Sequence, residues 1–419
     1  MNDIMGIIEE FKNRECECGQ DHLTTIKDIH VGSGLVNRVG EILKANGFPK
    51  KLLLVADQNT IKAADGIENS LTDFEIEYKI YDNIRVARME HVEELEELIK
   101  NREIGVLSVG SGSVNDPCRL AAARQNKLLC IFATAPSMDG FASNTSPIVA
   151  DGFKASYTAK SPEVIIGDTK ILAKAPVALK SSGFGDMVAK YVALIDWKIS
   201  NLLIGEPYCE RVAALTRNAI DILMGMADRV TNEDEETAGE IFKALLLTGI
   251  GMSFTKNSRP ASGSEHVISH LIECVQLRDG IIPNFHGEDV GVCTLLMLKY
   301  YNELAKKEHI TAKRETVDFN DVYDFYAEMA DDVKKLNEPD TITDLFAPED
   351  LEKNWGKIRE IIHSVPSYDE CLEAMKKAGC KLTVKDIGKP EKLMNDCIYY
   401  SPFMRRRLTL LRMQYMIED

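Results

Sequence analysis

The chain has 419 residues, more than a single hydrophobic core usually holds, so we expect two domains. Hydrophobic residues make up 45% and charged residues 28%, a balance typical of globular proteins rather than disordered or fibrous ones. With 66 acidic and 50 basic side chains, the net charge of −16 repels a nucleic-acid backbone. The acidic start, MNDIMGIIEEFKNRE, is unlike a secretory signal, and no window reaches the roughly 18 apolar residues of a membrane span. We therefore expect a cytoplasmic protein that binds neither nucleic acid nor membrane and keeps its ten cysteines as thiols.

A short motif near the N-terminus, CECGQDH, places Cys16, Cys18 and His22 close together in the sequence. Cysteine and histidine at such spacing can bind zinc, but this motif lacks the second pair of ligands that a closed zinc site normally has. We therefore predict free thiols at these positions and no metal.

Short aliphatic or β-branched segments alternate with longer helical patterns from about residue 24 to 170, which predicts βαβ units on a parallel sheet. Alternating apolar and polar residues from 147 to 168, interrupted by an Asp-Gly pair, predict a hairpin before the next element. Polar residues follow the strands, so they would gather at the sheet edge where open α/β folds bind ligands. The candidate strands are 51–56, 75–81, 104–109 and 128–133.

The segment IGVLSVGSGSVND, residues 104–116, is typical of a buried strand that runs into a glycine-rich turn and then a helix. Glycines there let backbone N–H groups approach a diphosphate, and the helix start adds partial positive charge. Gly110, Gly112 and Ser113 are therefore candidate nucleotide-binding residues. A plain tight turn is the alternative, because the string differs from GxGxxG.

Two other segments that follow strands carry polar groups for the same nucleotide. Asp57 ends a strand, where its carboxylate can bind a ribose 2′-hydroxyl and repel a 2′-phosphate, which favours NAD over NADP. A helix N-cap explains Asp57 equally well. Thr134 and Ser137 follow another strand and can border the nicotinamide, or they belong to a turn made by Pro136 and Gly140.

Beyond about residue 171, strand signals nearly vanish, and apolar residues three and four positions apart predict long helices. We therefore predict an α/β domain over residues 1–170 and an all-helical domain over residues 171–419, with a cleft between them. The basic run 404–407 is expected on a terminal amphipathic helix, with its charges solvated or salt-bridged. The clearest helical patterns are 187–203, 210–229 and 236–254.

Three of the eight histidines, His266, His270 and His286, fall in one short stretch. His266 and His270 lie four residues apart and so share one face of a predicted helix, which Ser262 or Ser264 would cap. His286 is predicted to open the next helix. Histidines at this spacing are more often packed or exposed than metal-bound when nothing else converges on them.

Asp186, in GFGDMVAKY, is a candidate group that converges on these histidines. We predict it at the start of a helix near the domain boundary. Two imidazoles and one carboxylate form a site for Zn²⁺, Fe²⁺ or Ni²⁺ that leaves a coordination position open for a substrate oxygen. Such a site is catalytic rather than structural. Without the histidines, an N-cap would be the better explanation of Asp186.

Five ordered motifs, GSGSVND, TAPSMDGFAS, GFGDMVAKYVALIDW, SRPASGSEHVISHLIE and HGEDVGV, resemble the glycerol-1-phosphate dehydrogenases, especially their bacterial AraM-like branch. The resemblance spans about residues 31–292. It places the chain in the wider group of glycerol dehydrogenases, iron-dependent alcohol dehydrogenases and dehydroquinate synthases. It implies a nucleotide-binding α/β domain with a parallel sheet, a helical C-terminal domain and one divalent metal between them. NAD(H) or NADP(H) as cofactor and a homo-oligomer, a dimer or larger, are expected as well.

The resemblance also implies roles for individual residues. Asp186, His266 and His286 match the metal ligands, with zinc, nickel or iron as the ion, and Asp186 also lies near substrate. Asp139 and His270 match residues that bind substrate and take part in catalysis. Ser111 stands where relatives often have glycine, and serine must avoid a positive φ angle there. The implied dinucleotide-binding residues are Gly110, Ser111, Gly112, Ser113, Val114, Thr134, Ala135, Pro136, Ser137 and Ser143.

These features predict a dehydrogenase of phospholipid biosynthesis that interconverts dihydroxyacetone phosphate and sn-glycerol 1-phosphate. The metal would act as a Lewis acid on the C2 carbonyl oxygen, His270 or a water would relay the proton, and Asp139 would orient a hydroxyl. Arg259 is the candidate contact for the substrate phosphate, with a helix cap or an ion pair as alternatives. Rival functions are a dehydroquinate synthase-like lyase, whose family has a glutamate where this chain has Asp186, a polyol dehydrogenase, and a non-catalytic nucleotide- and metal-binding protein.

Overall fold

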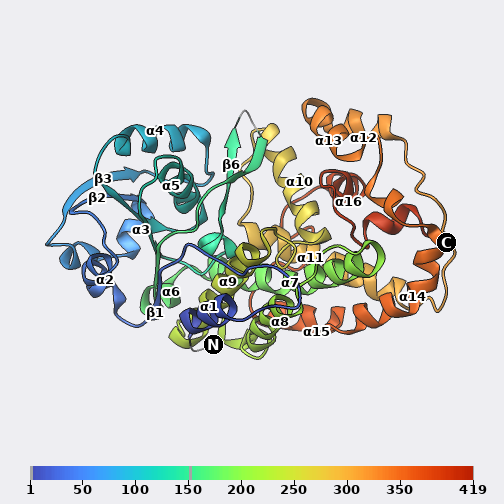
Figure 1. Cartoon of the computed structure of the whole chain (residues 1–419), viewed down its shortest axis with the longest axis horizontal. Coiled ribbons are helices and arrows are strands. Elements are labelled where there is room, and N and C mark those ends of the chain that lie inside the picture. The colour runs from blue at the N-terminus through green and yellow to red at the C-terminus, as the bar shows by residue number, and fades with distance from the viewer. Residues whose placement is uncertain (1–2, 151–152, 419) are drawn as a thin grey trace.

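The computed structural model describes residues 3–150 and 153–418. Its central feature is a sheet in which six described strands run parallel in the order β1-β8-β5-β4-β2-β3 (Figure 1). Strands β2, β4, β5 and β8 are almost entirely buried, which explains their continuous aliphatic sequence. The strands are β1 (Asp28–Gly32), β2 (Lys51–Asp57), β3 (Glu75–Tyr81), β4 (Gly105–Gly110), β5 (Leu129–Ala133) and β8 (Val164–Asp168).

The four predicted strands correspond to β2, β3, β4 and β5 within one residue at each end, and their parallel pairing is confirmed. Strand β1 has no counterpart among them. The predicted hairpin is also present, formed by β6 (Thr145–Ala150) and β7 (Phe153–Thr158) in antiparallel register. The Asp-Gly pair that suggested it lies outside the described residues. After the hairpin, β8 returns to the main sheet between β1 and β5.

Helices cover both faces of the sheet because alternate residues of each strand point to opposite sides. Leu52 and Leu54 of β2 pack in the same apolar cluster as Val39 and Leu43 of α2. Their neighbours on the strand face the other cluster, which contains residues of α4 and α5. The helices of this part are α1 (Ile4–Asn13), α2 (Val39–Ala45), α3 (Gln58–Ala63), α4 (Met89–Ile99), α5 (Gly112–Arg124) and α6 (Thr169–Lys174).

From α6 onward the regular elements of the described chain are helices, so the predicted fold class is confirmed. The longest, α7 (Val177–Ile204), passes through the middle of the molecule beside α9 and α11, between the sheet and the later helices (Figure 1). None of the helices described is both long enough and apolar enough to cross a bilayer. The other helices are α8 (Glu210–Met224), α9 (Glu235–Thr255), α10 (Ser264–Arg278), α11 (His286–Leu304), α12 (Phe319–Tyr326), α13 (Ala330–Asn337), α14 (Pro348–His363), α15 (Tyr368–Lys377) and α16 (Glu391–Tyr400).

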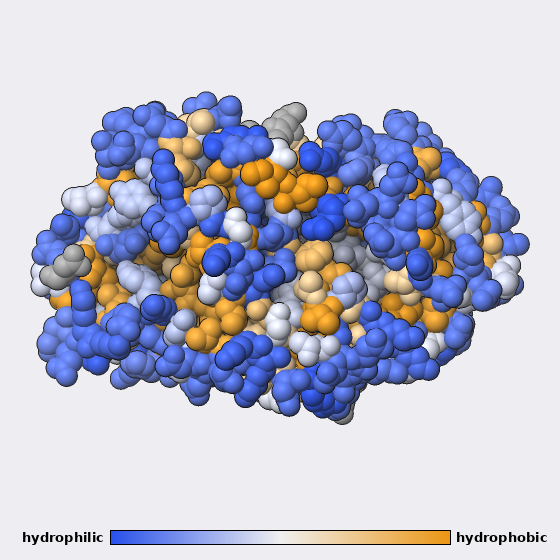
Figure 2. Space-filling view, turned by 180° about the vertical axis from the view of Figure 1, so that it is seen from behind, coloured by the Kyte–Doolittle hydropathy of each residue, from blue (hydrophilic) through white to orange (hydrophobic). Residues whose placement is uncertain are grey.

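The change from strands to helices near residue 169 lies at the predicted boundary, and the division into two domains stays a prediction. Seen from behind, hydrophilic residues form most of the rim, and hydrophobic residues gather across the middle of the face (Figure 2). The predicted terminal helix around residues 404–407 is wrong, because this run follows the short 3₁₀ helix Ser401–Phe403 as an irregular loop. Arg406 and Arg407 instead donate hydrogen bonds to backbone carbonyls of Leu336 and Ser262.

Candidate metal and nucleotide site

Asp186 is completely buried and lies well inside α7, not at a helix start, so both that prediction and the N-cap alternative are wrong. The small residues before it resemble a loop in sequence, but they serve close packing of the helix. A Cβ atom on Gly183 would lie 1.9 Å from the Pro136 carbonyl oxygen, and one on Gly185 would lie 2.7 Å from the Gly287 carbonyl oxygen. The glycines therefore bring α7 against both the sheet edge and α11.

His266 and His286 converge on Asp186 from α10 and α11. His266 Nε2 lies 3.4 Å from Asp186 Oδ1, and the His266 and His286 ring centroids are 5.4 Å apart. One ligand atom from each of the three residues lies within 4.8 Å of the others, a spacing compatible with one shared metal ion. A carboxylate oxygen and two imidazole nitrogens suit Zn²⁺, Fe²⁺ or Ni²⁺ and leave room for further ligands.

The start of α10 is held by carboxylates, not by the predicted serine caps. Gly263 is the N-cap residue, and its N–H donates to Glu265. Ser264 is the first helical residue, and its N–H and hydroxyl both donate to Asp196 Oδ2, at 2.8 and 2.7 Å. The prediction that Ser262 or Ser264 caps this helix is therefore wrong.

Glu265 fixes the orientation of the His266 ring. It is completely buried, and its Oε1 lies 2.6 Å from His266 Nδ1. An Nδ1–H that donates to this carboxylate leaves Nε2, the nitrogen nearest Asp186, with a free lone pair. Histidines that bind metals almost always have such a carboxylate or carbonyl partner. The donor set therefore fits a metal ion in its chemistry as well as in its spacing.

Lys190 lies buried between two carboxylates of the site. Its Nζ is 2.5 Å from Asp186 Oδ1 and 2.8 Å from Asp139 Oδ2. The backbone N–H of Asp139 also donates to Asp186 Oδ2, at 2.9 Å. Asp139 belongs to the short 3₁₀ helix Asp139–Ala142 that follows β5. These contacts join the predicted substrate residue Asp139 to the predicted metal ligand.

Of the three candidate ligands, Asp186 and His286 have protonation states that suit metal binding. Burial and Lys190 lower the pKa of His266, but its contacts with Asp186 and Glu265 raise it above its ordinary value. Burial tends to raise the pKa of Asp186, but Lys190 and then His266 lower it below its ordinary value. Burial lowers the pKa of His286 to about 4, with His266 adding to the effect and Asp186 opposing it. At neutral pH the carboxyl group is therefore ionised and His286 is neutral, the forms that bind metals.

His270, the predicted substrate residue, lies beside the two histidines of the cluster, with ring centroids 5.9 Å from His266 and 5.7 Å from His286. Burial lowers its pKa well below the ordinary value, and the charges of His286, His266, Arg405 and Lys154 lower it further. His270 is therefore neutral near pH 7 and can accept or donate a proton.

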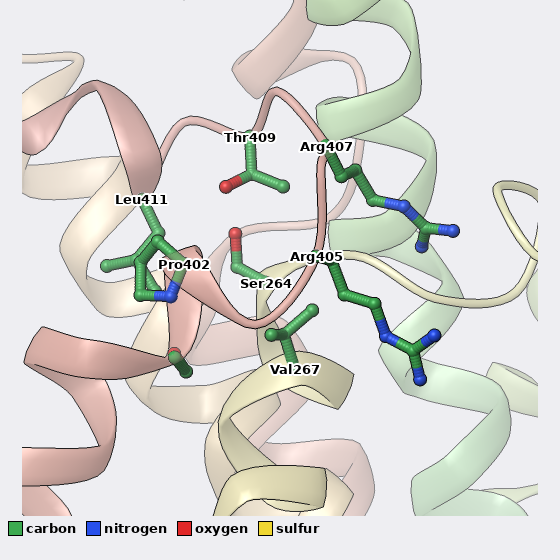
Figure 3. Close-up of a pocket in the computed structure, with 8 residues that line it drawn as sticks. Ser264, Val267, Pro402, Arg405, Arg407, Thr409 and Leu411 are labelled. Atoms are coloured by element: carbon green, nitrogen blue, oxygen red, sulfur yellow. The ribbon is translucent and has the colours of Figure 1, made fainter. Parts of the chain in front are cut away.

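Two arginines of the loop after residue 403 extend in the same direction beside the first turn of α10 (Figure 3). Arg407 is held by the Ser262 carbonyl oxygen at 2.7 Å and the Ser258 hydroxyl at 2.9 Å. Arg405 is exposed, and no hydrogen bond or ion pair joins it to a carboxylate of the described residues. The positive charge of Arg405 is among those that lower the pKa of His270.

The predicted nucleotide turn joins β4 to α5, and Ser111 is compatible with it. Ser111 has φ −120°, an extended conformation open to any residue, so the turn does not require glycine at its middle position. Gly110 is needed for close approach, since a Cβ there would lie 2.8 Å from Val114 Cβ. A Cβ on Gly112 would lie 3.1 Å from Met138 Cε, a tight contact with the flexible end of a side chain. Ser113, at the start of α5, directs its hydroxyl to the Arg85 carbonyl oxygen at 3.1 Å.

Asp57, the Gly110 turn and the segment Thr134–Ser137 follow β2, β4 and β5, which are neighbours in the sheet. The structure therefore brings these three predicted segments to one edge. Asp57 caps α3 by accepting hydrogen bonds from the N–H groups of Asn59 and Thr60, as the N-cap interpretation required. Its binding of a ribose stays a prediction.

The loop after β5 connects the nucleotide edge to the metal cluster. Thr134 N–H donates to the Gly110 carbonyl oxygen at 3.2 Å. The Ser137 carbonyl oxygen accepts a hydrogen bond from the Ser182 hydroxyl of α7, which in turn accepts one from the N–H of Gly287 in α11. Within this loop Ala135 is buried, and Pro136 approaches α7 through its carbonyl. Ser143 is buried farther along, with its hydroxyl 3.0 Å from that of Thr145.

Arg259 does not face this site, so its prediction as a phosphate contact is wrong. It is 2% exposed and pairs with Glu206, with Nε 2.8 Å from Oε1. It also donates to the Ser200 hydroxyl and the Leu408 carbonyl oxygen. The ion-pair alternative is therefore confirmed.

Sequence reasoning missed Lys190, Glu265 and Arg405. Lys190 follows Asp186 by one helical turn in GDMVAK, a spacing that could have indicated the pair. Glu265 precedes His266 directly, but adjacency does not show that the two side chains meet. For Arg405 the sequence showed only a basic run. Its position beside α10 could not be predicted, because it lies in a loop far along the chain.

Residues 30–176 match the family model described as iron-containing alcohol dehydrogenase. A glycerol-1-phosphate dehydrogenase [NAD(P)+] of Halalkalibacterium halodurans is 28% identical over 95% of this chain and 94% of its own length. Another, of Methanosphaera stadtmanae, is 33% identical over 65% of this chain and 77% of its own length. In fold, the chain resembles NADH-dependent butanol dehydrogenase A of Thermotoga maritima, with TM-score 0.61, 16% identity, and coverage of 95% and 94%. On the strength of these similarities, the chain belongs to the glycerol-1-phosphate dehydrogenase family.

Proposed function

We propose that the protein is a metal-dependent dehydrogenase that uses NAD(H) or NADP(H) to interconvert dihydroxyacetone phosphate and sn-glycerol 1-phosphate. The observation that carries the proposal is the convergence of Asp186, His266 and His286 beside the glycine-rich edge of the sheet. Relatives named glycerol-1-phosphate dehydrogenase [NAD(P)+] support the substrate and the cofactor.

Asp186, His266 and His286 would hold the divalent ion. When bound, the ion supplies Lewis acidity toward the negative charge that develops on a carbonyl oxygen during hydride transfer. Glu265 keeps Nε2 of His266 available, and Lys190 keeps Asp186 ionised. These residues prepare the site before substrate arrives.

The nucleotide would lie along the edge formed by the ends of β2, β4 and β5. The backbone N–H groups at the start of α5, in Gly110–Val114, would bind its diphosphate. Thr134–Ser137 and Ser143 would border the nicotinamide half. Asp57 would bind the adenosine ribose through the carboxylate that also caps α3, and this arrangement favours NAD(H).

His270 would transfer the proton to or from the substrate hydroxyl, because it is neutral near pH 7 and lies against the metal-binding histidines. Asp139 would orient a substrate hydroxyl while Lys190 holds its carboxylate. Arg405 would bind the phosphate group, taking the role first considered for Arg259. It is an exposed cation that pairs with no carboxylate of the described residues, and its charge lowers the pKa of His270.

The test is oxidation of NADH, and separately of NADPH, with dihydroxyacetone phosphate, followed by chiral analysis of the product. We expect sn-glycerol 1-phosphate, and we expect His286→Ala to lose turnover together with the bound metal. Turnover of glycerol or dihydroxyacetone at an equal rate would instead favour a polyol dehydrogenase. Turnover that persists in metal-free protein would contradict the metal-dependent proposal.

Arg405 is tested by comparing phosphorylated and unphosphorylated ketones. Arg405→Ala should raise KM for dihydroxyacetone phosphate by at least about tenfold, the lower end of a lost charged contact, with little change for dihydroxyacetone. Arg406→Ala is the matched control, since Arg406 is exposed in the same loop but donates to backbone carbonyls, including that of Leu336. An unchanged KM in Arg405→Ala would exclude the phosphate contact.

A further inference from the structure

Four metal-ligating side chains meet at a second place in the molecule, near the N-terminus. Cys16, Cys18 and His22 lie between α1 and β1, in a segment without helix or strand. Cys209 is the N-cap residue of α8. One ligand atom from each of the four lies within 4.8 Å of the others. The short sequence motif therefore has a fourth partner, which lies 187 residues after His22 and could not be recognised from local spacing.

The distances between these atoms match a tetrahedral zinc site. In a regular tetrahedron with Zn–S bonds of about 2.3 Å and a Zn–N bond of about 2.0 Å, two sulfurs lie about 3.8 Å apart and a sulfur and a nitrogen about 3.5 Å apart. Cys16 Sγ and Cys209 Sγ are 3.6 Å apart. His22 Nε2 lies 3.5 Å from Cys18 Sγ and 3.5 Å from Cys209 Sγ.

The imidazole of His22 is oriented as a ligand. Its Nδ1 lies 3.3 Å from the carbonyl oxygen of Phe254, so an Nδ1–H donates there and leaves Nε2 free toward the sulfurs. The ring is 2% exposed and packs against Phe11 and Phe254, at centroid distances of 5.4 and 5.5 Å. A backbone carbonyl partner of this kind is typical of metal-binding histidines.

The backbone between the first two cysteines is also shaped to bring them together. Gly19 N–H donates to the Cys16 carbonyl oxygen at 2.9 Å, which closes a turn around Cys18. Gly19 has φ +70°, a conformation that glycine adopts without strain. The turn thus depends on the glycine of the CECG sequence, and it holds both thiols on the side of Cys209.

We propose that Cys16, Cys18, His22 and Cys209 form a closed structural zinc site, separate from the Asp186 cluster. Three thiolates and one imidazole fill a tetrahedral ion and leave no position for substrate. Soft thiolate ligands favour zinc over hard cations such as magnesium. Zinc enters as Zn²⁺ and displaces the thiol protons into solvent, without oxidation or reduction. The prediction of free thiols in this motif is thereby replaced.

The site would anchor the N-terminal segment to the helical part of the chain. Cys16, Cys18 and His22 belong to the segment that leads from α1 into β1, at one edge of the sheet. Cys209 begins α8, and Phe254 is near the end of α9. Because the segment has no regular structure of its own, a four-ligand ion would add a fixed connection to the packing that Ile8, Phe11 and Ile26 already provide.

The experiment measures zinc in a protein whose other site is disabled. His286→Ala removes a ligand of the Asp186 cluster, and dialysis against a weak chelator clears what binds there loosely. We expect one zinc ion per chain to remain in this protein when it is prepared with reductant. In the same background, Cys18→Ser or Cys209→Ser should lose it, whereas Cys380→Ser should keep it, since Cys380 is a partly buried thiol outside the cluster.

Cobalt substitution gives a readout that needs no cysteine variant. Co²⁺ bound in the His286→Ala protein should show sulfur-to-metal charge-transfer absorption in the near ultraviolet, which the oxygen and nitrogen ligands of the Asp186 cluster cannot produce. Absence of zinc and of this absorption in the reduced His286→Ala protein would overturn the proposal. Zinc retained when Cys18 and Cys209 are both replaced, or a Cys16–Cys209 disulfide found by mass in the reduced protein, would overturn it as well.

Discussion

Lys190 shows how the charge at the site is balanced when no ion is bound. Burial alone lowers the pKa of a lysine, but Asp139 and Asp186 raise that of Lys190 above its ordinary value, so it stays protonated. Its ammonium group is the direct partner of both carboxylates. Removing it leaves buried negative charge uncompensated, unless a metal cation takes its place.

We therefore predict that Lys190→Met lowers the free energy of unfolding by an amount that depends on whether a metal ion is bound. Without metal, we expect the free energy of unfolding to fall by about 3–5 kcal/mol, the usual effect of breaking a buried ion pair. With saturating metal the loss should be smaller, because the ion supplies positive charge to Asp186. Urea unfolding with excess metal and with chelator measures the difference.

Lys180→Met is the matched control for this experiment. Lys180 is also buried on α7, but it donates to the carbonyl oxygens of Ala173 and Asn232 and to no carboxylate in the described part of the chain. Its loss should destabilise the protein equally with and without metal. An equal loss for Lys190→Met in the two conditions would show that Lys190 and the ion do not share a charge.

Glu265→Gln isolates the effect of the carboxylate charge on His266. Glutamine keeps an oxygen that accepts hydrogen bonds from His266 Nδ1 and from Gly263 N–H, so the local geometry is retained. The loss of charge makes the imidazole a weaker ligand. We expect the metal affinity to fall by about tenfold, measured by competition with a coloured chelator. Glu210→Gln, which changes an exposed partner of Lys198, should leave the affinity unchanged.

The sequence could identify the residues of the metal cluster but not the contacts that support them. His266 and His286 were recognisable from their clustering, and Asp186 from its setting among small residues. Lys190 and Glu265 were not identified because the sequence does not distinguish a buried charged residue from an exposed one unless its partners are known. Arg259 was misjudged for the same reason, since the pairing with Glu206 joins segments far apart in the chain.

At the scale of elements, Asp196 joins three parts of the helical region. Its Oδ2 accepts from Ser264 at the start of α10, and its Oδ1 accepts from the Tyr301 hydroxyl of α11 and the N–H of Leu410, both at 2.8 Å. Asp196 itself is on α7, four helical turns from Ser182. The helices that carry the three histidines are therefore positioned by one buried carboxyl group.

The titration of Asp196 predicts how stability depends on pH. Burial raises its pKa from the ordinary 3.8 to about 6, with Glu265 adding to this and the N–H groups of Leu410 and Ser264 opposing it. A raised pKa means that the folded state favours the protonated form. Its contribution to stability is therefore full below about pH 4 and is lost as pH rises through about 6, by about 3 kcal/mol in all.

Asp196→Asn removes this titration and is the comparison to make. Its amide places a donor near N–H groups, so the variant is less stable by an amount that does not depend on pH. We expect the unfolding free energy of the wild type minus that of the variant to fall by about 3 kcal/mol between about pH 4 and pH 7. A difference that stays constant over this range would show that Asp196 is ionised throughout.

Element boundaries were predictable where one pattern dominated. Strands β2, β4 and β5 were found within a residue or so because continuous aliphatic runs end at aspartate, glycine or threonine. Strand β3 was found from a mixed sequence, EIEYKIY, that ends before Asp82. The start of α7 was placed ten residues late, at 187 instead of 177, because Ser181, Ser182, Gly183 and Gly185 are weak helix formers. Those residues are helical because close packing against Pro136 and α11 outweighs local propensity.

At the scale of the whole molecule, the candidate site is assembled from parts that lie far apart in the sequence. The nucleotide edge comes from three strand ends, and the metal ligands come from α7, α10 and α11. A sequence pattern reports each part separately. Their meeting follows from the parallel sheet, whose strand ends share an edge, and from glycines that let α7 and α11 approach within backbone contact.

A metal ion that bridges three helices should stabilise the folded chain as a whole. Unfolding separates Asp186, His266 and His286, so the ion binds the native state far better than the unfolded one. At a free metal concentration of 100 times Kd, we expect the free energy of unfolding to rise by about 2.7 kcal/mol over that of the chelated protein. His286→Ala should lose this gain, and subtracting its response cancels stabilisation by ions bound elsewhere. Equal gains in the two proteins, measured by urea unfolding, would show that the three helices are not joined by a metal at this site.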